Sequence, residues 1–574
     1  MTNSEIAKIL YEISEYLEMD DIPFKPRAYQ KVAETLESLE EDVREIYKRG
    51  GLKAIGEIPG VGVSIAEKIE ELLKTGRLKY YEALKKKAPV DLATLTRIEG
   101  LGPKSIKRLY QEFKIKNLAD LEKAAKAGKI RNLEGFGEKS EEKILKGIEF
   151  LKKSGSRFIL GFVMPQIRVI EERLRKLKEV DELVVAGSVR RKKETIGDVD
   201  ILVISKKPKP VMEYFVNMPE VINVYAHGET KSMIKLKNGL DVDIRVVPRE
   251  SYGAALNYFT GSKEHNVALR EIASKSGYKL NEYGLFRGKK QIAGRTEEDL
   301  YKALGMDYIE PEMRENSGEI ELAKKHALPQ LIDYGDLMGD LQVQTNWTDG
   351  ANSIFEMAKA AIKIGLKYIV ITDHTKRLAM AHGLDEKRIQ EQWKEIDEVN
   401  KKFKVSSVKF WVLKGSECDI LKDGSMDLPD KILAKLDVVG ASVHSFFNLS
   451  REEQTKRIIR VMENPNVDII FHPTGRLINK RDAYKLDMDE IIKFAKKTGT
   501  ILEIDAFPDR SDLKDEYIRK CVEAGVNMSI DSDAHSIHHF EFLEYGIAQA
   551  RRGWASKNDI INTQSLDGLL KFLK

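Results

Sequence analysis

The sequence has only two cysteines, Cys418 and Cys521, among 574 residues. Two cysteines are too few for a disulfide scaffold or a cysteine zinc finger, and so low a number is typical of a reducing compartment. No run of apolar residues approaches the roughly 18 that a membrane-spanning helix needs. The first residues also lack the basic and then apolar segments of a secretory signal. We therefore predict a cytoplasmic protein without a membrane partner.

Charge and histidine are distributed unevenly along the chain. The formal net charge is +4, but basic residues exceed acidic ones by about 7 in residues 1–316, whereas residues 317–574 carry about −3. A basic region is typical of proteins that bind a polyanion, so we expect such a partner for the first part only. Eight of the ten histidines lie after residue 316. At about 100–200 residues per domain, the length predicts three to five domains.

Three near-repeats occur within the first 155 residues, which otherwise have the apolar spacing of helices. Each repeat reads apolar-x-Gly-apolar-Gly, then a Ser or Lys and a helical stretch. The paired glycines are Gly60 and Gly62, Gly100 and Gly102, and Gly135 and Gly137. A Gly-x-Gly turn that opens a helix exposes backbone N–H groups to a phosphate. One such turn could be an ordinary helix–helix connection, but three with lysines close behind resemble helix–hairpin–helix motifs, which bind the DNA backbone without reading sequence.

A different pattern follows, with β-rich runs at residues 183–186, 199–204 and 242–247. Between the first two runs, residues 187–191 read Gly-Ser-Val-Arg-Arg and residues 197–200 read Gly-Asp-Val-Asp. This combination of a Gly-Ser turn, paired arginines and alternating aspartates is the strongest signal in the chain.

The alternating aspartates predict a metal site. Asp198 and Asp200 are two residues apart on a strand and so share one face. With Asp243 from a later strand, they form an oxygen donor set suited to Mg²⁺ or Mn²⁺, and a pair of such ions serves nucleotidyl transfer. An Asp-x-Asp strand alone is more often a charged surface, but the neighbouring Gly-Ser-x-Arg-Arg element favours the catalytic interpretation. A triphosphate would be bound by Gly187, Ser188, Arg191 and Gly197.

Histidines in the last part of the chain follow β-rich runs, such as residues 368–372 and 438–443, that alternate with helical segments. This alternation predicts an α/β barrel, in which the carboxyl ends of the strands build the site. Imidazole and carboxylate ligands there suit Mn²⁺ or Zn²⁺. A place in the core is the alternative for any single histidine, but four at strand ends favour a metal centre. The candidate ligands are His374, Glu417, His444, His472, Asp533 and His535.

Residues 1–316 resemble the family X DNA polymerases, of which DNA polymerase beta is the best-known member. The resemblance rests on the palm pattern above and on residues 258–262, Tyr-Phe-Thr-Gly-Ser. It implies short-gap filling in DNA repair, with dNTPs and gapped, nicked or primer–template DNA as partners. It places Tyr258 and Phe259 at the incoming sugar, Gly261 at a close approach, Asn266 at the minor-groove edge of the nascent base pair, and Arg270 and Glu282 on the template side.

Residues 58–68 match the deoxyribose-phosphate lyase segment of the same family, and Lys68 falls at its Schiff-base lysine. A lysine amine can attack the aldehyde of an abasic sugar. The resemblance also implies a 5′-phosphate pocket at Lys25 and Tyr29. Ser64 stands where a second basic residue is common, which predicts a weaker grip on the phosphate. On spacing alone, Lys68 would be a phosphate contact or a solvated helix residue.

Residues 335–574 resemble the polymerase-and-histidinol-phosphatase (PHP) domain, which bacterial and archaeal family X polymerases carry as a Mn²⁺-dependent 3′–5′ exonuclease. The resemblance adds Asp349 to the metal ligands. The family's first motif is Asp-Leu-His-x-His-Thr, but this chain has Gln342 and Gln344 in place of both histidines. Because a carboxamide is a poor ligand beside imidazole, we predict that the nuclease is lost or much reduced. The alternative is that two metals remain and still hydrolyse.

As a whole, the sequence predicts a monomeric DNA repair polymerase, with lyase activity at Lys68 as a further expectation. Two alternatives are a hydrolase that the polymerase half only delivers to DNA and a non-catalytic DNA-binding scaffold. The two glutamines argue against the first and the intact aspartates against the second. The predicted fold is multidomain α+β and α/β, with a helical lyase-like domain (1–85), helix–hairpin–helix fingers (86–155), a nucleotidyltransferase palm (156–248), a thumb (249–316), a linker (317–334) and a distorted (β/α)7-type PHP barrel (335–574).

Overall fold

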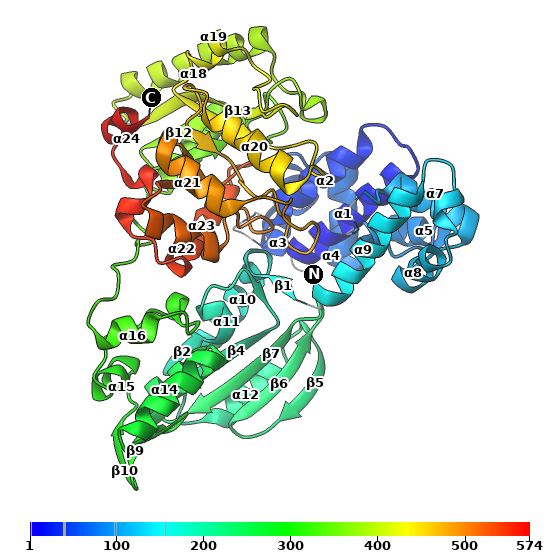
Figure 1. Cartoon of the computed structure of the whole chain (residues 1–574). Helices are drawn as coiled ribbons and strands as arrows, with labels where there is room; N and C mark the ends of the chain where they lie inside the picture. The colour runs from blue at the N-terminus through cyan, green and yellow to red at the C-terminus, as the bar shows by residue number, and fades with distance from the viewer. Residues whose placement is uncertain are drawn as a thin grey trace. The chain divides into compact units, whose positions relative to one another are not determined.

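The computed structural model describes the chain except for residues 2, 38, 40, 41, 97, 99, 155, 156 and 574. The chain divides into two compact units, Met1–Gly155 with Asn479–Arg481 and Ser156–Ile478 with Asp482–Lys574. Figure 1 traces the chain from the blue N-terminus to the red C-terminus. The predicted boundary between fingers and palm, at residues 155 and 156, lies outside the described residues. Over the part that is described, no helix is both long and apolar enough to cross a membrane.

The first unit is built from helices, as the sequence predicts. They are α1 (Asn3–Met19), α2 (Lys25–Glu37), α3 (Val43–Gly56), α4 (Val63–Thr75), α5 (Lys79–Lys87), α6 (Leu92–Leu95), α7 (Pro103–Phe113), α8 (Leu118–Lys126) and α9 (Glu138–Ser154). Ile6, Leu10 and Ile13 lie on one face of α1 and are fully buried. This spacing of apolar residues is what folds α1 against α2 and α4 in one core. A second core holds α7, α8 and α9 together.

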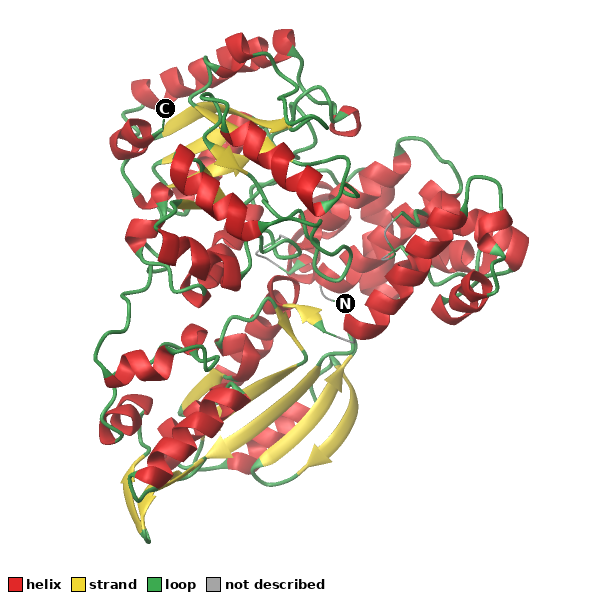
Figure 2. Cartoon of the chain, in the orientation of Figure 1, coloured by secondary structure: helices red, strands yellow, loops and turns green. Residues whose placement is uncertain are grey.

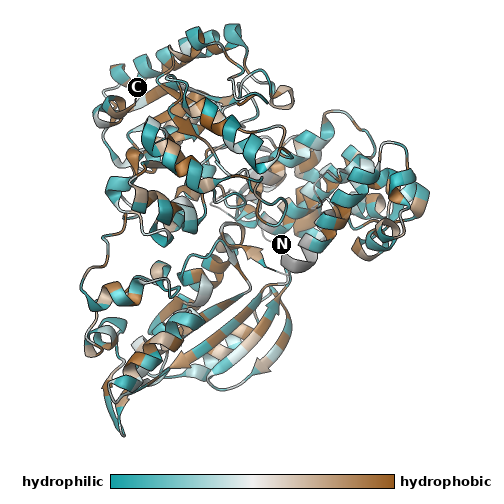
Figure 3. Ribbon diagram, in the orientation of Figure 1, coloured by the Kyte–Doolittle hydropathy of each residue, from teal (hydrophilic) through white to brown (hydrophobic). Residues whose placement is uncertain are grey.

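The second unit opens with the predicted palm, a five-stranded sheet in the order β2-β4-β7-β6-β5. Its elements are β1 (Phe158–Ile159), α10 (Leu160–Arg175), β2 (Glu182–Val185), α11 (Gly187–Arg190), β3 (Thr195–Ile196), β4 (Asp198–Ile204), α12 (Pro208–Val216), β5 (Val221–His227), β6 (Lys231–Leu236) and β7 (Asp241–Val247). Val199 and Ile201 of β4 join the core beneath α10 and α12. Because side chains alternate along a strand, Asp198 and Asp200 face the other way. Figure 3 shows this alternation of hydrophobic and hydrophilic residues along the strands.

The predicted thumb follows the palm. Its elements are α13 (Tyr252–Thr260), α14 (Lys263–Lys275), β8 (Lys279–Asn281), β9 (Gly284–Arg287), β10 (Lys290–Ala293) and α15 (Glu297–Ala303). Arg314 is fully buried in it, and Arg314 Nη1 lies 2.5 Å from Glu297 Oε1. Arg190 of the palm reaches the same carboxylate, with Nη2 at 2.6 Å from Glu297 Oε2. These buried ion pairs tie the palm to the thumb.

Residues 317–334, predicted as a linker, include helix α16 (Glu319–Lys324). Ile320 and Ala323 of this helix are buried in the same core as the thumb helices. The carboxylate of Glu319 lies 2.7 Å from Nδ1 of His265 on α14. The segment therefore packs on the thumb, while the domain boundaries themselves stay predictions.

The last part of the chain is the predicted barrel, with seven parallel strands in sequence order, covered by helices (Figure 2). Its elements are β11 (Gly339–Val343), α17 (Ile354–Lys363), β12 (Tyr368–Ile371), α18 (Glu386–Val405), β13 (Trp411–Asp419), α19 (Asp430–Leu433), β14 (Val438–Ser442), α20 (Arg451–Met462), β15 (Ile469–Ile470), α21 (Met488–Thr498), β16 (Ile501–Asp505), α22 (Asp515–Ala524), β17 (Met528–Asp531), α23 (Leu543–Arg552) and α24 (Leu566–Phe572). The Gln344 N–H donates to the Ala534 carbonyl at 2.8 Å, which joins the end of the first strand to the segment after the last. This nearly closed arrangement confirms the (β/α)7 prediction and gathers the strand ends.

Candidate active site and metal centre

The three palm aspartates lie on adjacent strands. β4 and β7 run parallel, with Asp200 directly opposite Asp243 and Asp198 opposite Asp241. Asp198, Asp200 and Asp243 therefore share one face of the sheet. Burial, and then the charges of Asp198 and Asp243, raise the pKa of Asp200 to about 7. A divalent cation would relieve this repulsion, and the donor set of carboxylate oxygens fits Mg²⁺ or Mn²⁺.

The predicted Gly-Ser turn is packed against these carboxylates. Gly187 has a φ of 63°, in the left-handed region that favours glycine. A Cβ at this position would lie 2.7 Å from Asp200 Oδ2. The Ala186 N–H donates to the Asp200 carbonyl at 2.7 Å, which fixes the turn to β4. The backbone that precedes Ser188 is thus placed beside the aspartates.

Arg191, the predicted phosphate-binding arginine, is held by two residues of the thumb. Its Nε donates to Glu315 Oε1 at 3.2 Å, and its Nη1 donates to the Thr260 carbonyl. Gly261 has a φ of 67°, and a Cβ there would lie 3.1 Å from Arg191 Nη1. The structure therefore brings Arg191 and the Thr-Gly turn together.

The end of α13 lies over the aspartate face of the palm. Arg245 is two residues after Asp243 on β7, and its guanidinium carbon is 4.6 Å from the centroid of the Phe259 ring. The ring of Tyr258 meets Phe259 edge-on, with centroids 5.1 Å apart. Tyr258 and Phe259 are therefore placed beside the predicted metal site.

Helix α14 and the turn between β8 and β9 carry the remaining predicted contacts of the thumb. Asn266 Nδ2 donates to the Tyr258 carbonyl at 2.7 Å, while Asn266 Oδ1 is buried and has no hydrogen-bond partner among the described residues. Arg270 Nε donates to the Asn266 carbonyl at 3.3 Å. Glu282 lies in the turn between β8 and β9. Asn266 is thus coupled to the α13 turn, whereas Glu282 belongs to a separate hairpin.

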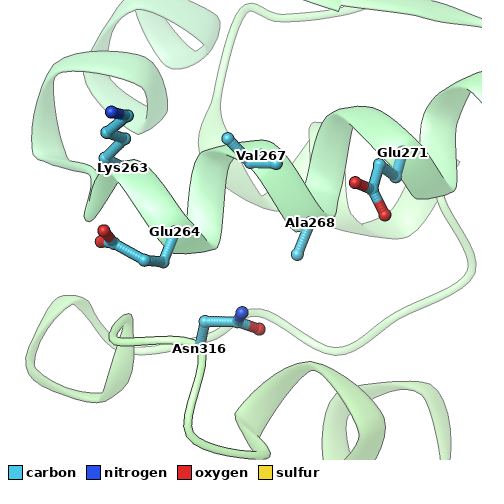
Figure 4. A pocket seen from close by; sticks show the side chains of 6 residues that line it. All are labelled: Lys263, Glu264, Val267, Ala268, Glu271 and Asn316. Carbon is cyan, nitrogen blue, oxygen red and sulfur yellow. The ribbon is translucent and has the colours of Figure 1, made fainter.

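A different face of α14 lines a cavity of about 280 Å³ (Figure 4). In Figure 4, Glu264 and Ala268 lie on the side of the helix nearer to Asn316 of the neighbouring segment, whereas Lys263 and Val267 point away from it. The lining residues are Lys263, Glu264, Val267, Ala268, Glu271 and Asn316. These include none of the predicted nucleotide-binding residues, so the cavity is separate from the predicted dNTP site.

The three Gly-x-Gly turns of the first unit share one geometry. Their first glycines have φ values of 82° at Gly60, 80° at Gly100 and 81° at Gly135. The second glycines, Gly62, Gly102 and Gly137, directly precede α4, α7 and α9. The N-cap residues of α4 and α7 are glycines, and among the described residues neither N-terminus has a side-chain capping hydrogen bond, which suits a phosphate there. Helix α9 instead has two acidic residues in its first turn, which disfavour an anion.

Lys68 lies on α4, close to the ring of Tyr80 and within the electrostatic influence of Lys25. Its Nζ donates to the carbonyl and to Oγ of Ser64, both at 2.9 Å, and lies 5.0 Å from the centroid of the Tyr80 ring. Burial lowers the pKa of Lys68, and the charge of Lys25 acts in the same direction. Burial raises the pKa of Tyr29 to about 12, with Tyr80 adding to it. The structure thus places Lys25 near Lys68, with Tyr29 near Tyr80.

The predicted barrel ligands form two groups at the carboxyl ends of the strands. In each group, one ligand atom per residue lies within 4.8 Å of the others; the groups are Asp349 with His374 and His535, and His374 with Glu417 and His444. His472 Nε2 lies 2.8 Å from Glu417 Oε1. Although burial opposes the charged form, Glu417 raises the pKa of His374 to about 9. This donor set of imidazoles and carboxylates fits Mn²⁺ or Zn²⁺.

The two glutamines change this centre in different ways. Gln344 Nε2 donates to Glu417 Oε2 at 3.0 Å, so an amide N–H is bound to an oxygen that a metal would use. Gln342 is fully buried, and neither of its amide atoms has a hydrogen-bond partner within the described part of the chain. Asp533 pairs with Arg510, whose Nε is 3.4 Å from Asp533 Oδ2, and belongs to neither ligand group.

Asp419 and Arg510 belong to the barrel centre but were not among the residues predicted from the sequence. Asp419 shares a face of β13 with Glu417, and its Oδ1 lies 3.5 Å from His444 Nδ1. The spacing of two residues along a strand, which identified the palm aspartates, was an available signal. Arg510 is a single arginine in a loop after β16, and no pattern in the sequence marks it.

The palm sheet and its aspartates define a nucleotidyltransferase, and residues 167–274 match the nucleotidyltransferase domain model. The DNA polymerase beta thumb model matches residues 255–315, the helix-hairpin-helix domain model residues 1–78, and the SAM-like helix-hairpin-helix tandem model residues 81–149. The chain is 38% identical to the DNA polymerase/3′-5′ exonuclease PolX of Bacillus subtilis (strain 168), with 100% of each chain covered. It belongs to the family X DNA polymerases.

Two further relatives are similar to parts of the chain. DNA polymerase lambda of Rattus norvegicus is 28% identical over 294 residues, which cover 45% of this chain and 48% of that protein. A probable phosphatase of Thermoanaerobacter sp. (strain X514) is 31% identical over 227 residues, which cover 37% of this chain and 84% of that protein. The second likeness accords with the PHP barrel.

Proposed function

We propose that this family X DNA polymerase fills short gaps during DNA repair, with Asp198, Asp200 and Asp243 as its catalytic carboxylates. The pairing of Asp200 with Asp243 in register, beside the Gly187 turn, carries the proposal. Burial and the charges of Asp198 and Asp243 raise the pKa of Asp200, and a carboxylate perturbed in this way is typical of functional sites. A divalent cation, Mg²⁺ or Mn²⁺, would activate the primer 3′-hydroxyl and stabilise the leaving pyrophosphate.

Residues around the aspartates supply the contacts that a dNTP needs. Backbone N–H groups at the Gly187 turn and the hydroxyl of Ser188 can donate to a triphosphate, and Arg191 adds a positive charge. Because Arg191 is held by Glu315 and the Thr260 carbonyl, its guanidinium is oriented before the nucleotide arrives. The remaining contacts to sugar, base and template are assigned to Gly197, Tyr258, Phe259, Gly261, Asn266, Arg270 and Glu282.

DNA would be held through its backbone by the helix–hairpin–helix turns of the first unit. The uncapped N-termini of α4 and α7, each opened by a Gly-x-Gly turn, are the elements that support this. Contacts of this kind position DNA without reading its sequence. Gapped, nicked and primer–template duplexes are therefore the expected partners.

Single-nucleotide incorporation on a one-nucleotide-gapped duplex tests the polymerase site. Asp243→Ala should lower incorporation by about 10³-fold or more, because it removes a ligand of the catalytic cation. Binding to the same duplex, followed by fluorescence anisotropy, should not change. Asp241→Ala is the matched control, because Asp241 lies two residues earlier on β7 and pairs with Lys235 at 2.8 Å. Incorporation that survives Asp243→Ala would overturn the metal-site assignment, whereas a wild-type protein that binds the duplex but incorporates no nucleotide would favour a scaffold.

A second activity is proposed for Lys68, the removal of 5′-deoxyribose phosphate through a Schiff base. Its support is the neighbourhood of Lys25, Tyr29 and Tyr80 and the lowered pKa of the Lys68 amine. A lowered pKa leaves a larger share of the amine unprotonated at neutral pH, as nucleophilic attack requires.

For the barrel, we infer that the nuclease is lost or much reduced. The hydrogen bond from Gln344 to Glu417 and the unpartnered amide of Gln342 support this. The second candidate is a residual Mn²⁺-dependent hydrolase, favoured by the two ligand groups that share His374.

Primer length separates these two cases. The protein would be incubated with a 5′-labelled primer on a gapped duplex, with Mn²⁺ and no dNTPs. We expect an unchanged primer, in a preparation shown to extend it once dNTPs are added. Shortening that vanishes with His472→Ala would mean that the glutamines are tolerated and that the protein both edits and fills.

We also infer that the protein works as a monomer in the cytoplasm. The low cysteine content supports the compartment. Light scattering of the purified protein would test the monomer through its mass.

A further inference from the structure

The barrel helix α23 ends in two arginines that contact the palm and thumb. Arg552 Nη1 donates to the carbonyl of Arg191 at 3.0 Å and to Glu315 Oε1 at 3.1 Å. Its Nη2 donates to Asp515 Oδ2 at 2.5 Å, on the barrel's own α22. The Arg552 side chain is only 2% exposed. A barrel side chain therefore bonds to the main chain of the predicted triphosphate-binding residue.

Glu315 joins Arg552 to the guanidinium of Arg191. Oε1 of Glu315 lies 3.2 Å from Arg191 Nε, 3.1 Å from Arg552 Nη1 and 3.3 Å from Lys193 Nζ. With the Thr260 carbonyl, Glu315 is what orients the Arg191 guanidinium. Arg552 consequently fixes both the backbone of Arg191 and the carboxylate that aims its side chain.

Nearby contacts of the same helix hold the palm around Lys192 and the thumb around Glu312. Glu544 of α23 lies 2.6 Å from Lys192 Nζ and also pairs with Arg168 of α10. Arg551 Nε lies 2.8 Å from Glu312 Oε1, just before Glu315 in the chain. None of these residues belongs to the metal ligand groups of the barrel.

We propose that Arg552 of the barrel is a positioning residue for nucleotide binding, acting through Glu315 and the main chain of Arg191. The proposal rests on the role of Arg191 in the proposed function. An arginine that is already held in place can bind a triphosphate without first changing its conformation. A mobile arginine must instead be ordered at the moment of binding, which costs free energy. The barrel then contributes to polymerisation whatever the state of its metal ligands.

The test is a dNTP titration with the full-length protein on a one-nucleotide-gapped duplex. We expect Arg552→Ala to raise the KM for dNTP about tenfold, with kcat and the Kd for DNA changed less than about twofold. Arg551→Ala is the matched control: it removes the neighbouring barrel–thumb contact but none to Glu315 or Arg191, and it should leave KM within about twofold of wild type. Equal effects of the two variants, or no effect of Arg552→Ala, would overturn the proposal.

A double-mutant cycle separates this inference from the assignment of Arg191. If Arg552 acts through Arg191, adding Arg552→Ala to Arg191→Ala should raise KM no further. If the fold-increases in KM of the two single variants multiply in the double variant, Arg552 does not act through Arg191. A wild-type protein that incorporates no nucleotide would instead mean that the proposed function fails. Should Arg552→Ala unfold the protein, Glu315→Gln replaces it, because it removes the carboxylate charge that pairs with both Arg552 and Arg191 while keeping side-chain size, and it should give the same rise in KM.

Discussion

Asp200 and Asp243 lie directly opposite each other on the parallel strands β4 and β7, and Gly187 closes over Asp200. The register of the sheet places Asp200 opposite Asp243. Gly187 can approach Asp200 because glycine has no side chain. Two carboxylates held this close repel each other unless a cation or a proton intervenes. The palm therefore holds the aspartates in a geometry that favours cation binding, and Gly187 is part of that geometry.

Gly187→Ala should lower nucleotide incorporation about 10- to 100-fold, because strain at a positive φ costs of order 1–3 kcal/mol and the new Cβ displaces a ligand carboxylate. Its Cβ would lie 2.7 Å from Asp200 Oδ2. Gly239→Ala is the matched control: Gly239 also has a positive φ, of 92°, but only Phe158 lies near its Cβ, at 3.8 Å. The measurement is the rate of nucleotide incorporation by each variant. Equal losses of rate in the two variants would show that backbone strain, and not contact with Asp200, is responsible.

Lys68→Ala should abolish covalent trapping of the protein on a 5′-deoxyribose-phosphate duplex by borohydride. Reduction captures a Schiff base, which only an amine can form. Lys68→Arg should fail in the same way, because a guanidinium stays protonated. Lys74→Ala, which removes a lysine of the same helix paired with Glu70 at 2.9 Å, is the control and should trap normally. Trapping that persists in Lys68→Ala would assign the nucleophile to another amine.

The sequence was sufficient to predict those features in which spacing dictates geometry. Asp198 and Asp200 share a face because a strand alternates, and the Gly-x-Gly turns share one backbone conformation because only glycine adopts it freely. The barrel ligands, His374 and Glu417 among them, converge because parallel strands end at one rim. The prediction of strands and helices for palm and barrel was confirmed for the same reason.

Features that depend on packing between distant segments were beyond reach of the sequence. Arg552 and Arg191 are separated by 361 positions, and no sequence pattern around either residue predicts their contact. Helix α16 is six residues long, too short for a periodic pattern, yet Glu319 binds the buried His265. The position of Arg510 beside Asp533 likewise follows from a loop whose path only the fold reveals.

Restoring both histidines should restore metal binding in the barrel. The double variant Gln342→His with Gln344→His should gain at least one bound Mn²⁺ by calorimetry and shorten a primer about 10- to 100-fold faster than wild type, the range typical of metal-site ligands and their partners. His472→Ala in that background should abolish the gain. Gln454→His is the control, because Gln454 is also buried and without a hydrogen-bond partner among the described residues but lies on α20. No gain in the double variant would mean that the glutamines are not the cause of the loss.

Glu297 should make the stability of the protein depend on pH in the acid range. Burial opposes its charged form, but Arg314 and Arg190 lower the pKa of Glu297 to about 2 from an ordinary value of 4.5. Stabilisation by a carboxylate with a lowered pKa is complete above its unfolded value and is lost as the pH falls toward its folded value. The difference in unfolding free energy between wild type and Glu297→Gln should therefore be constant above about pH 5 and shrink by about 3 kcal/mol as the pH approaches 2. Urea titrations at each pH measure this difference. The control is Glu298→Gln, because Glu298 is the next residue and is exposed. A difference that does not change with pH would show that Arg190 and Arg314 do not lower the pKa of Glu297.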